Sequence, residues 1–200
     1  MSELTDLYAQ IRTCTRCLLA KSRTRAVPGE GPEDAAVMFI GEAPGFHEDK
    51  TGRPFVGAAG HFLEELLASI DMTRQDVYIA NVIKCRPPGN RDPSPIEIEA
   101  CQSYLDRQIE LIRPKMVITL GRFSMARYFP GSRISSIHGK PLKIDDVLYY
   151  PMFHPAAALH QPKLRHTVEQ DMQKIPELLA EIDQIQNSQK PDEIQQLSLF

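Results

Sequence analysis

The four cysteines of the sequence are spaced as a single metal centre would require. Cys14 and Cys17 form a C-x2-C pair, and Cys85 and Cys101 follow after a gap of 67 residues. Four thiolates that include one close pair can hold a tetrahedral zinc ion or an iron–sulfur cluster. The spacing alone does not choose between these metals, and four unrelated buried thiols are the alternative without any metal.

Three other polar residues stand where apolar runs end. Glu42 follows VMFIG, Asn81 lies within VYIANVIK, and His154 ends YYPMFH just before a proline. A carboxylate can hold water, an asparagine side chain can read the edge of a nucleobase, and a histidine can donate to a developing oxyanion. Taken singly, each has an ordinary structural explanation as a helix-terminus acid, a turn former or a helix cap.

Two loops between these positions carry residues that suit nucleic acid. Phe55 lies in GRPFVGAAG among glycines and a proline, where an aromatic ring either fills the core or stacks on an unpaired base. The loop KCRPPGNR joins Lys84, Arg86 and Arg91 to a possible metal ligand, and Lys140 follows in a later loop. We expect these four cations to contact phosphates, although scattered solvated charge is the alternative.

The elements that must position these residues alternate along the chain. Apolar runs predict strands at residues 37–41, 77–84, 116–121, 142–144 and 147–153. Periodic apolar residues predict helices at about 4–12, 60–70, 96–112 and 162–185, the third of them started by Ser94-Pro95. This alternation predicts an α/β fold, in which ligands bind beyond the carboxyl ends of parallel strands. Glu42, Asn81 and His154 are therefore expected to converge on one cleft.

Length and charge limit the possibilities further. The 200 residues suit one domain with a tail, and the hydrophobic fraction of 42% suits a soluble protein. No apolar stretch approaches the roughly 20 residues of a membrane helix, and the polar N-terminus does not resemble a secretory signal. We therefore expect a cytoplasmic protein. Residues 1–170 carry 21 Lys/Arg and 20 Asp/Glu, and residues 171–200 carry 2 and 6, so the net negative charge of the chain lies in its last 30 residues.

Together these motifs resemble one known family. GEAPG, GRPFVGAAG, NVIKCRPPGNR and HPAA, with cysteines spaced as here, are similar to the family 4 uracil-DNA glycosylases from Cys14 to about residue 175. The resemblance implies a three-layer α/β/α sandwich around a short, mostly parallel sheet. It implies one [4Fe–4S] cluster on Cys14, Cys17, Cys85 and Cys101, and it implies monofunctional excision of uracil from DNA, which leaves an abasic site for base excision repair.

The resemblance also assigns roles to individual residues. Glu42 would place and activate the attacking water, and His154 would stabilise the charge that builds on uracil O2. Ala43 and Gly45 would line the pocket, Phe55 would stack on the flipped uracil, and Asn81 would read its edge. The chain departs from the family pattern at His138, where an arginine is expected, and at His160, which replaces a cation.

The domain is expected to span residues 1–185, with a disordered tail at 186–200 because of its polar and charged composition. The tail ends in an apolar peptide that resembles the sequence by which bacterial repair proteins bind the sliding clamp, with Gln196, Leu197, Leu199 and Phe200 as its anchors. The expected partners are thus uracil-containing DNA and a sliding clamp, for a protein that is itself a monomer.

Two rival functions use the same residues differently. An iron–sulfur electron carrier has no need for Glu42, Asn81 and His154 to converge. A zinc-stapled DNA-binding module without catalysis would be colourless, whereas an iron–sulfur protein is brown.

Overall fold

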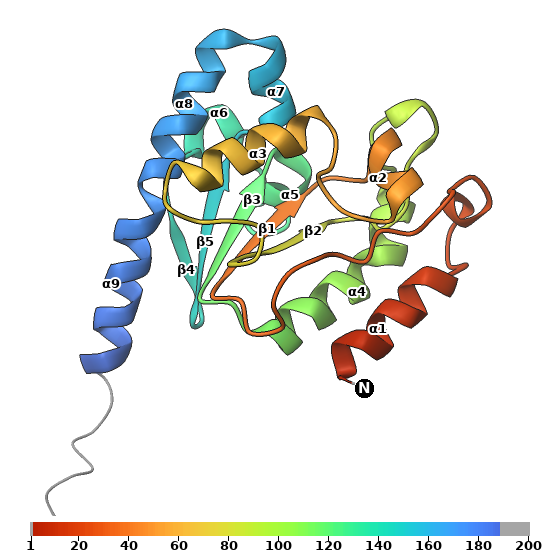
Figure 1. Ribbon diagram of the computed structural model, residues 1–200, viewed down its shortest axis with the longest axis horizontal. Helices are drawn as coiled ribbons and strands as arrows, with labels where there is room; N and C mark the ends of the chain where they lie inside the picture. Colours follow the sequence, from red (N-terminus) through yellow and green to blue (C-terminus); the bar gives the residue numbers. More distant parts are fainter. Residues whose placement is uncertain (1, 189–200) are drawn as a thin grey trace, which may run out of the picture.

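The structure is a computed structural model that describes residues 2–188. The peptide at residues 196–200, in which we predict clamp binding, lies outside this range. Figure 1 shows the elements, which in chain order are: α1 Glu3–Thr13, a 3-10 turn at Leu18–Lys21, β1 Val37–Gly41, α2 Phe46–Thr51, α3 Ala58–Ala68, β2 Tyr78–Asn81, a 3-10 turn at Pro88–Asn90, α4 Pro95–Ile112, β3 Met116–Leu120, α5 Arg122–Ala126, α6 Ile134–Ile137, β4 Leu142–Ile144, β5 Val147–Met152, α7 Pro155–His160, α8 Pro162–Gln173 and α9 Ile175–Ser188.

The five strands form one sheet in the order β2-β1-β3-β5-β4. β1 pairs in parallel with β2 and β3, and β3 pairs in parallel with β5. Only β4 is antiparallel, because it forms a hairpin with β5 around the turn at Asp145-Asp146. Every residue of β1 and β3 is buried, as expected for continuous apolar strands that are covered on both faces.

Helices cover both faces of this sheet (Figure 1). On one face, Leu7 of α1 and Leu105 of α4 pack against Met38 and Ile40 of β1. On the other face, residues of α3 and α8 pack against Val37 and Phe39 of the same strand. Neighbouring residues of one strand thus enter opposite cores, because side chains alternate along a strand. The predicted three-layer α/β/α architecture is confirmed.

Helix α4 begins where the sequence predicts it to begin. Ser94 Oγ accepts a hydrogen bond from Glu97 N–H, and the Glu97 carboxylate accepts one at 2.8 Å from Ser94 N–H, which completes a capping box. The buried face of this helix carries both Cys101 and Gln108, seven residues apart and therefore on the same side. Because the capping box fixes where α4 begins, it also fixes the positions of both side chains along the helix axis.

Three boundaries differ from the prediction. The strand expected at 77–84 ends at Asn81. The single helix expected at 162–185 is divided at Lys174 into α8 and α9, because Pro176 has no N–H to continue the ladder. The short helices α2 and α6 were not predicted, since four to six residues are too few for a period to emerge, whereas α7 begins at Pro155, where the ordinary explanation of His154 as a helix cap places it.

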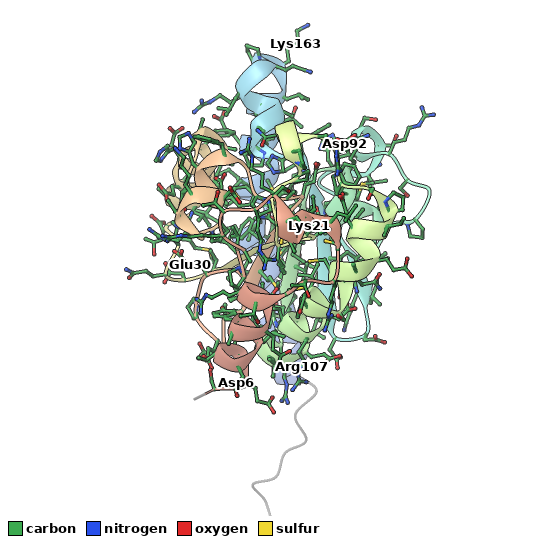
Figure 2. The ribbon with its side chains drawn as sticks, turned by 90° about the vertical axis from the view of Figure 1, so that its right-hand side faces the viewer. Asp6, Lys21, Glu30, Asp92, Arg107 and Lys163 are labelled. Atoms are coloured by element: carbon green, nitrogen blue, oxygen red, sulfur yellow. The ribbon has the colours of Figure 1, made fainter. Side chains whose placement is uncertain are left out.

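The two ends of the molecule are distinct. In Figure 2 the labelled Asp6 and Arg107 lie at the bottom, and Asp92 and Lys163 lie toward the top. Asp92 belongs to the loop that precedes α4, and Lys163 to the start of α8. The loops that follow the carboxyl ends of the strands gather toward this upper end. No helix in residues 2–188 is long and apolar enough to cross a membrane.

Candidate active site

A pocket of about 360 Å³ opens at the carboxyl ends of the parallel strands. It brings together seven of the residues singled out in the sequence: Glu42, Ala43, Gly45, Phe55, Asn81, Arg91 and His154. Six further residues complete its lining: Pro44, Glu48, Ala59, Pro87, Asn90 and Ala156. Glu42, Asn81 and His154 therefore line one pocket, as the strand-end rule predicts.

Sheet topology explains why the pocket forms here. The chain leaves β1 toward β2 on one side and returns to place β3 on the other side. Such a reversal leaves a crevice beyond the strand ends, where ligands of open α/β sheets bind. Gly121 follows β3 at this point with φ +87°, and a Cβ there would lie 3.1 Å from the Cβ of His154. Glycine thus lets the His154 segment approach the end of β3.

Gly41, the last residue of β1, lets two pocket side chains come together. A Cβ at this position would lie 2.4 Å from Asn81 Oδ1 and 2.7 Å from two ring atoms of Phe55. Even alanine would therefore displace the amide, the ring or both. The glycine that begins GEAPG provides space for the pocket floor.

Phe55 is held in a conformation that is unfavourable by itself. Its φ is +52°, its side chain is buried, and its ring stacks on that of His154 with centroids 5.5 Å apart and planes at 23°. Two charged side chains fix this loop. Arg74 donates to the carbonyl oxygens of Pro54 and Phe55, and Glu48 Oε1 accepts from Val56 N–H and Gly57 N–H, each at 2.9 Å.

Glu48 and Arg74 were not singled out from the sequence. Glu48 is one of two acids in an ordinary helical turn, and Arg74 lies in a polar turn before β2. Neither has a local pattern that reveals its partner, because the contacts join segments eight and nineteen residues apart. The one feature of the sequence that could have pointed to Glu48 is its position close after the GEAPG motif.

His154 is held as a neutral donor. Its Nδ1 accepts a hydrogen bond of 3.1 Å from Ala156 N–H, at the start of α7. An Nδ1 that accepts leaves the ring proton on Nε2. Burial lowers the pKa of His154 to about 4, although the nearby Glu48 carboxylate opposes the shift. At neutral pH the ring therefore carries one proton, on the nitrogen that is not bound to the backbone.

Glu42 follows β1 directly and is half-buried in the pocket wall. Burial raises the pKa of its carboxyl group above the usual value, the charge of Asp92 adds to this effect, and that of Arg122 opposes it. Asp92 and Arg122 form an ion pair with each other, and their charges act on the Glu42 carboxyl in opposite directions, with Asp92 the stronger. A carboxylate with a raised pKa is a better base toward water than a solvated one.

Asn81 is 2% exposed, and a buried cation holds its backbone. Lys84 Nζ donates to Asn81 O at 2.8 Å and to Gln108 Oε1 at 2.6 Å. Gln108 Nε2 in turn donates to Pro28 O and to Tyr78 OH. This buried network connects the end of β2 to α4.

The prediction that Lys84 contacts DNA is therefore wrong. Its side chain is 1% exposed, and both of its hydrogen bonds are internal. The physical reason is that β2 ends at Asn81 rather than at residue 84, so the chain turns inward and carries Lys84 beneath α4.

The other predicted cations lie on the surface. Arg91 lines the pocket and forms a two-bonded ion pair with Glu97. Arg86 Nε donates to Asn90 Oδ1 on the same loop. Lys140 is exposed after α6, outside the pocket lining, and its Nζ donates to Ser136 O. Arg91 thus lines the pocket, Arg86 is bonded to the lining residue Asn90, and Lys140 does neither.

All four cysteines line one small cavity between α1, the turn at Leu18–Lys21 and α4. Three of the sulfur atoms accept hydrogen bonds: Cys85 from Arg23 Nη1 at 3.0 Å, Cys101 from Lys84 N at 3.2 Å, and Cys14 from Arg16 N at 3.5 Å. N–H groups aimed at sulfur are typical of thiolate-bound iron–sulfur centres. The structure thus joins residues far apart in the sequence into one set of sulfur donors.

Comparisons with known proteins agree with this geometry. The model of the Uracil DNA glycosylase superfamily matches residues 28–187. The chain is 48% identical over 187 residues to a type-4 uracil-DNA glycosylase of Archaeoglobus fulgidus, covering 89% of this chain and 94% of the relative. A type-4 uracil-DNA glycosylase of Thermotoga maritima is 42% identical over 178 residues, which cover 86% and 93%. A type-5 uracil-DNA glycosylase of Pyrobaculum aerophilum is 31% identical over 150 residues, 66% of each chain.

The protonation of His154 can be measured directly. We expect ¹⁵N NMR of the histidine rings at pH 7 to show His154 protonated on Nε2 only, and its titration to centre on about pH 4. The cause is burial, which disfavours the imidazolium, and the Ala156 N–H, which occupies Nδ1. A His154→Gln variant identifies the signal. A midpoint near 6.5, or a proton on Nδ1 at pH 7, would contradict this assignment.

Proposed function

The chain belongs to the uracil DNA glycosylase superfamily, and we propose that it excises uracil from DNA by hydrolysing the N-glycosidic bond. The observation that carries this proposal is the convergence of Glu42, Phe55, Asn81 and His154, from separate strand ends and loops, on one pocket. The product is an abasic site, which base excision repair processes further. A pocket that follows three strand ends of a rigid sheet can hold an extrahelical base in a fixed orientation.

Uracil must leave the base stack to reach this pocket, which costs a few kcal/mol and less at a mispair. Stacking on Phe55 recovers part of that free energy. The amide of Asn81 offers both a donor and an acceptor to the base edge, so it can separate uracil from cytosine. Ala43 and Gly45 line the wall without bulk, which leaves room for the flat base beside the backbone.

Bond cleavage moves the electron pair of the N1–C1′ bond onto uracil. The Nε2–H of His154 donates to O2 of the departing anion, and because this histidine is neutral it does so without a full proton transfer. Glu42 holds the water that attacks C1′, and its carboxylate takes the proton that the water loses. Charge stabilisation of the leaving group is then the largest contribution to the rate.

Excision assays on two variants test these roles. We expect His154→Ala to lower the single-turnover rate by about 10²–10³-fold, as for other oxyanion donors, and Glu42→Ala by about 10²–10⁴-fold, as for other general bases. The measurement is alkaline strand cleavage of a labelled oligonucleotide with one uracil. His61→Ala and Glu99→Ala, which change exposed side chains of the same types, are matched controls and should leave the rate unchanged. A wild-type protein that binds this DNA and leaves its uracil in place would disprove the function.

We further propose that Cys14, Cys17, Cys85 and Cys101 hold a [4Fe–4S] cluster. The support is that all four line one cavity and that three of them accept N–H bonds. The cluster would tie α1 and the segment after it to α4. Its role there would be to stabilise the fold rather than to take part in catalysis.

Metal content tests the cluster. Protein purified without oxygen should be brown and should contain about four iron atoms and four sulfides per chain. Cys101→Ser should lose most of the iron and lower the melting temperature, whereas Ser103→Ala, two residues further along α4, should keep the iron. A colourless protein with one zinc per chain would contradict the proposal.

The tail carries a separate proposal, that the peptide at residues 196–200 binds a DNA sliding clamp. Its support is the sequence alone: Gln196, Leu197, Leu199 and Phe200 put apolar anchors on an otherwise polar segment. An apolar peptide of this kind can insert into a hydrophobic groove and become ordered on binding. The boundary expected at residue 185 moves to 188, because α9 continues to Ser188. We take the catalytic unit as residues 1–188 and the tail as 189–200, in a cytoplasmic monomer.

Pull-down with purified clamp tests this proposal. Deletion of residues 196–200, and the single change Phe200→Ala, should abolish capture by the clamp and leave excision from short oligonucleotides intact. Ser198→Ala, between the anchors, is the matched control and should still be captured. Unchanged clamp binding after the deletion would show that the peptide is not the contact.

A further inference from the structure

We propose that Phe46, with Lys50 and Arg86, forms a second stacking site at the pocket rim, which binds the nucleotide next to the flipped uridine. The ligand class is a nucleobase with its flanking phosphate. This inference rests on the proposed excision of uracil from DNA, since it names how the same site holds the neighbouring nucleotide.

The ring of Phe46 is exposed and surrounded by positive charge. Phe46 is 45% exposed, although its side chain is large and apolar. Lys50 Nζ lies 4.3 Å from the ring centroid, and Arg86 Cζ lies 5.1 Å from it. His47 packs edge-on against the same ring, with centroids 5.4 Å apart and planes at 84°. The ring is therefore oriented by its neighbours and is still open to solvent.

Phe46 lies on the rim of the pocket. Its neighbours Gly45 and Glu48 line one wall, and Pro87 and Asn90 line another. Arg86 connects the two walls, because its guanidinium lies over the Phe46 ring while its Nε donates to Asn90 Oδ1 at 2.7 Å. A nucleotide beside a uridine in the pocket can reach this part of the rim, where it would meet an aromatic face and two cations.

The two cations are available to phosphate. In the described part of the chain, neither Lys50 nor Arg86 forms an ion pair with a carboxylate, in contrast to Arg53, Arg91 and Arg165. A lysine on a flexible stem can leave the ring for a phosphate oxygen, which exposes the ring face to a base. Aromatic rings next to Lys and Arg are the usual means by which proteins bind unpaired nucleic acid without reading its sequence.

An alternative is that Phe46 is an isolated exposed side chain without a function, which is common on protein surfaces. That alternative does not account for two unpaired cations over the ring, nor for its place beside the pocket. It also makes a different prediction, because a ring without a ligand cannot sense whether the neighbouring nucleotide carries a base.

The test compares two single-stranded oligonucleotides, each with a central 2′-fluoro-2′-deoxyuridine, which resists cleavage. One has adenines on both sides, and the other has tetrahydrofuran abasic residues there. We expect Phe46→Ala to bind the first about tenfold more weakly than the wild type, as loss of one base–aromatic stack predicts, and the second equally well. Phe46→Leu, which keeps apolar bulk without a ring, should lose nearly as much as Phe46→Ala.

Leu142→Ala is the matched control, since Leu142 is 41% exposed on the edge strand β4, and it should bind both oligonucleotides like the wild type. Lys50→Met should weaken binding of both and reduce the dependence on salt, because it removes a phosphate contact. Equal losses on the two oligonucleotides for Phe46→Ala, or none on either, would overturn the stacking site. A wild type that fails to release uracil from an unmodified strand would instead disprove the proposed function, so the two failures are distinguishable.

Discussion

The buried ammonium of Lys84 is the interaction on which much of this structure depends. A charge placed in a protein interior is very costly unless it is fully hydrogen-bonded. Here Lys84 Nζ is bonded to Asn81 O and Gln108 Oε1, and burial still lowers its pKa to about 8. Its backbone N–H meanwhile donates to Cys101 Sγ. One residue thereby joins the end of β2, the middle of α4 and the cysteine cavity.

This network gives the pocket a rigid base. Because Lys84 holds the backbone carbonyl of Asn81, the backbone at the end of β2 cannot shift without breaking a buried, charge-assisted bond. Gln108 passes the constraint on to Tyr78, whose hydroxyl also meets that of Tyr8 on α1 at 2.7 Å. The α1 helix, the sheet and α4 therefore share one set of polar contacts. A group bound by the four cysteines would fix α1 and α4 from the other side of Lys84.

The sequence predicted the parts that depend on local patterns. The strands at 37–41 and 116–120 are continuous apolar runs, and α4 begins at a capping box, so both signals lie within a few residues. The convergence of Glu42, Asn81 and His154 followed from the rule for strand ends. Lys84 was misread because nothing nearby in the sequence shows that a lysine is buried. Its acceptor, Gln108, lies 24 residues further on. Glu48 and Arg74 escaped notice for the same reason, since each acts across a tertiary contact.

The pocket must keep one group neutral and another charged, and burial alone does not achieve this. Desolvation disfavours charge on any group, so it keeps His154 neutral, as leaving-group stabilisation requires, but it also favours protonated Glu42, which is then useless as a base. The structure resolves this conflict locally. Glu42 is only half-buried, so desolvation raises the pKa of its carboxyl group less completely than it would in the core, and the charge of Arg122 opposes the rise, although that of Asp92 adds to it. His154 is more deeply buried, and the cation-favouring effect of Glu48 is too small to reverse the effect of that burial on its pKa. Glu48 is in turn occupied by Val56 N–H and Gly57 N–H, which fix its charge on the Phe55 loop. The same carboxylate thus shapes the stacking loop and leaves the histidine free to donate.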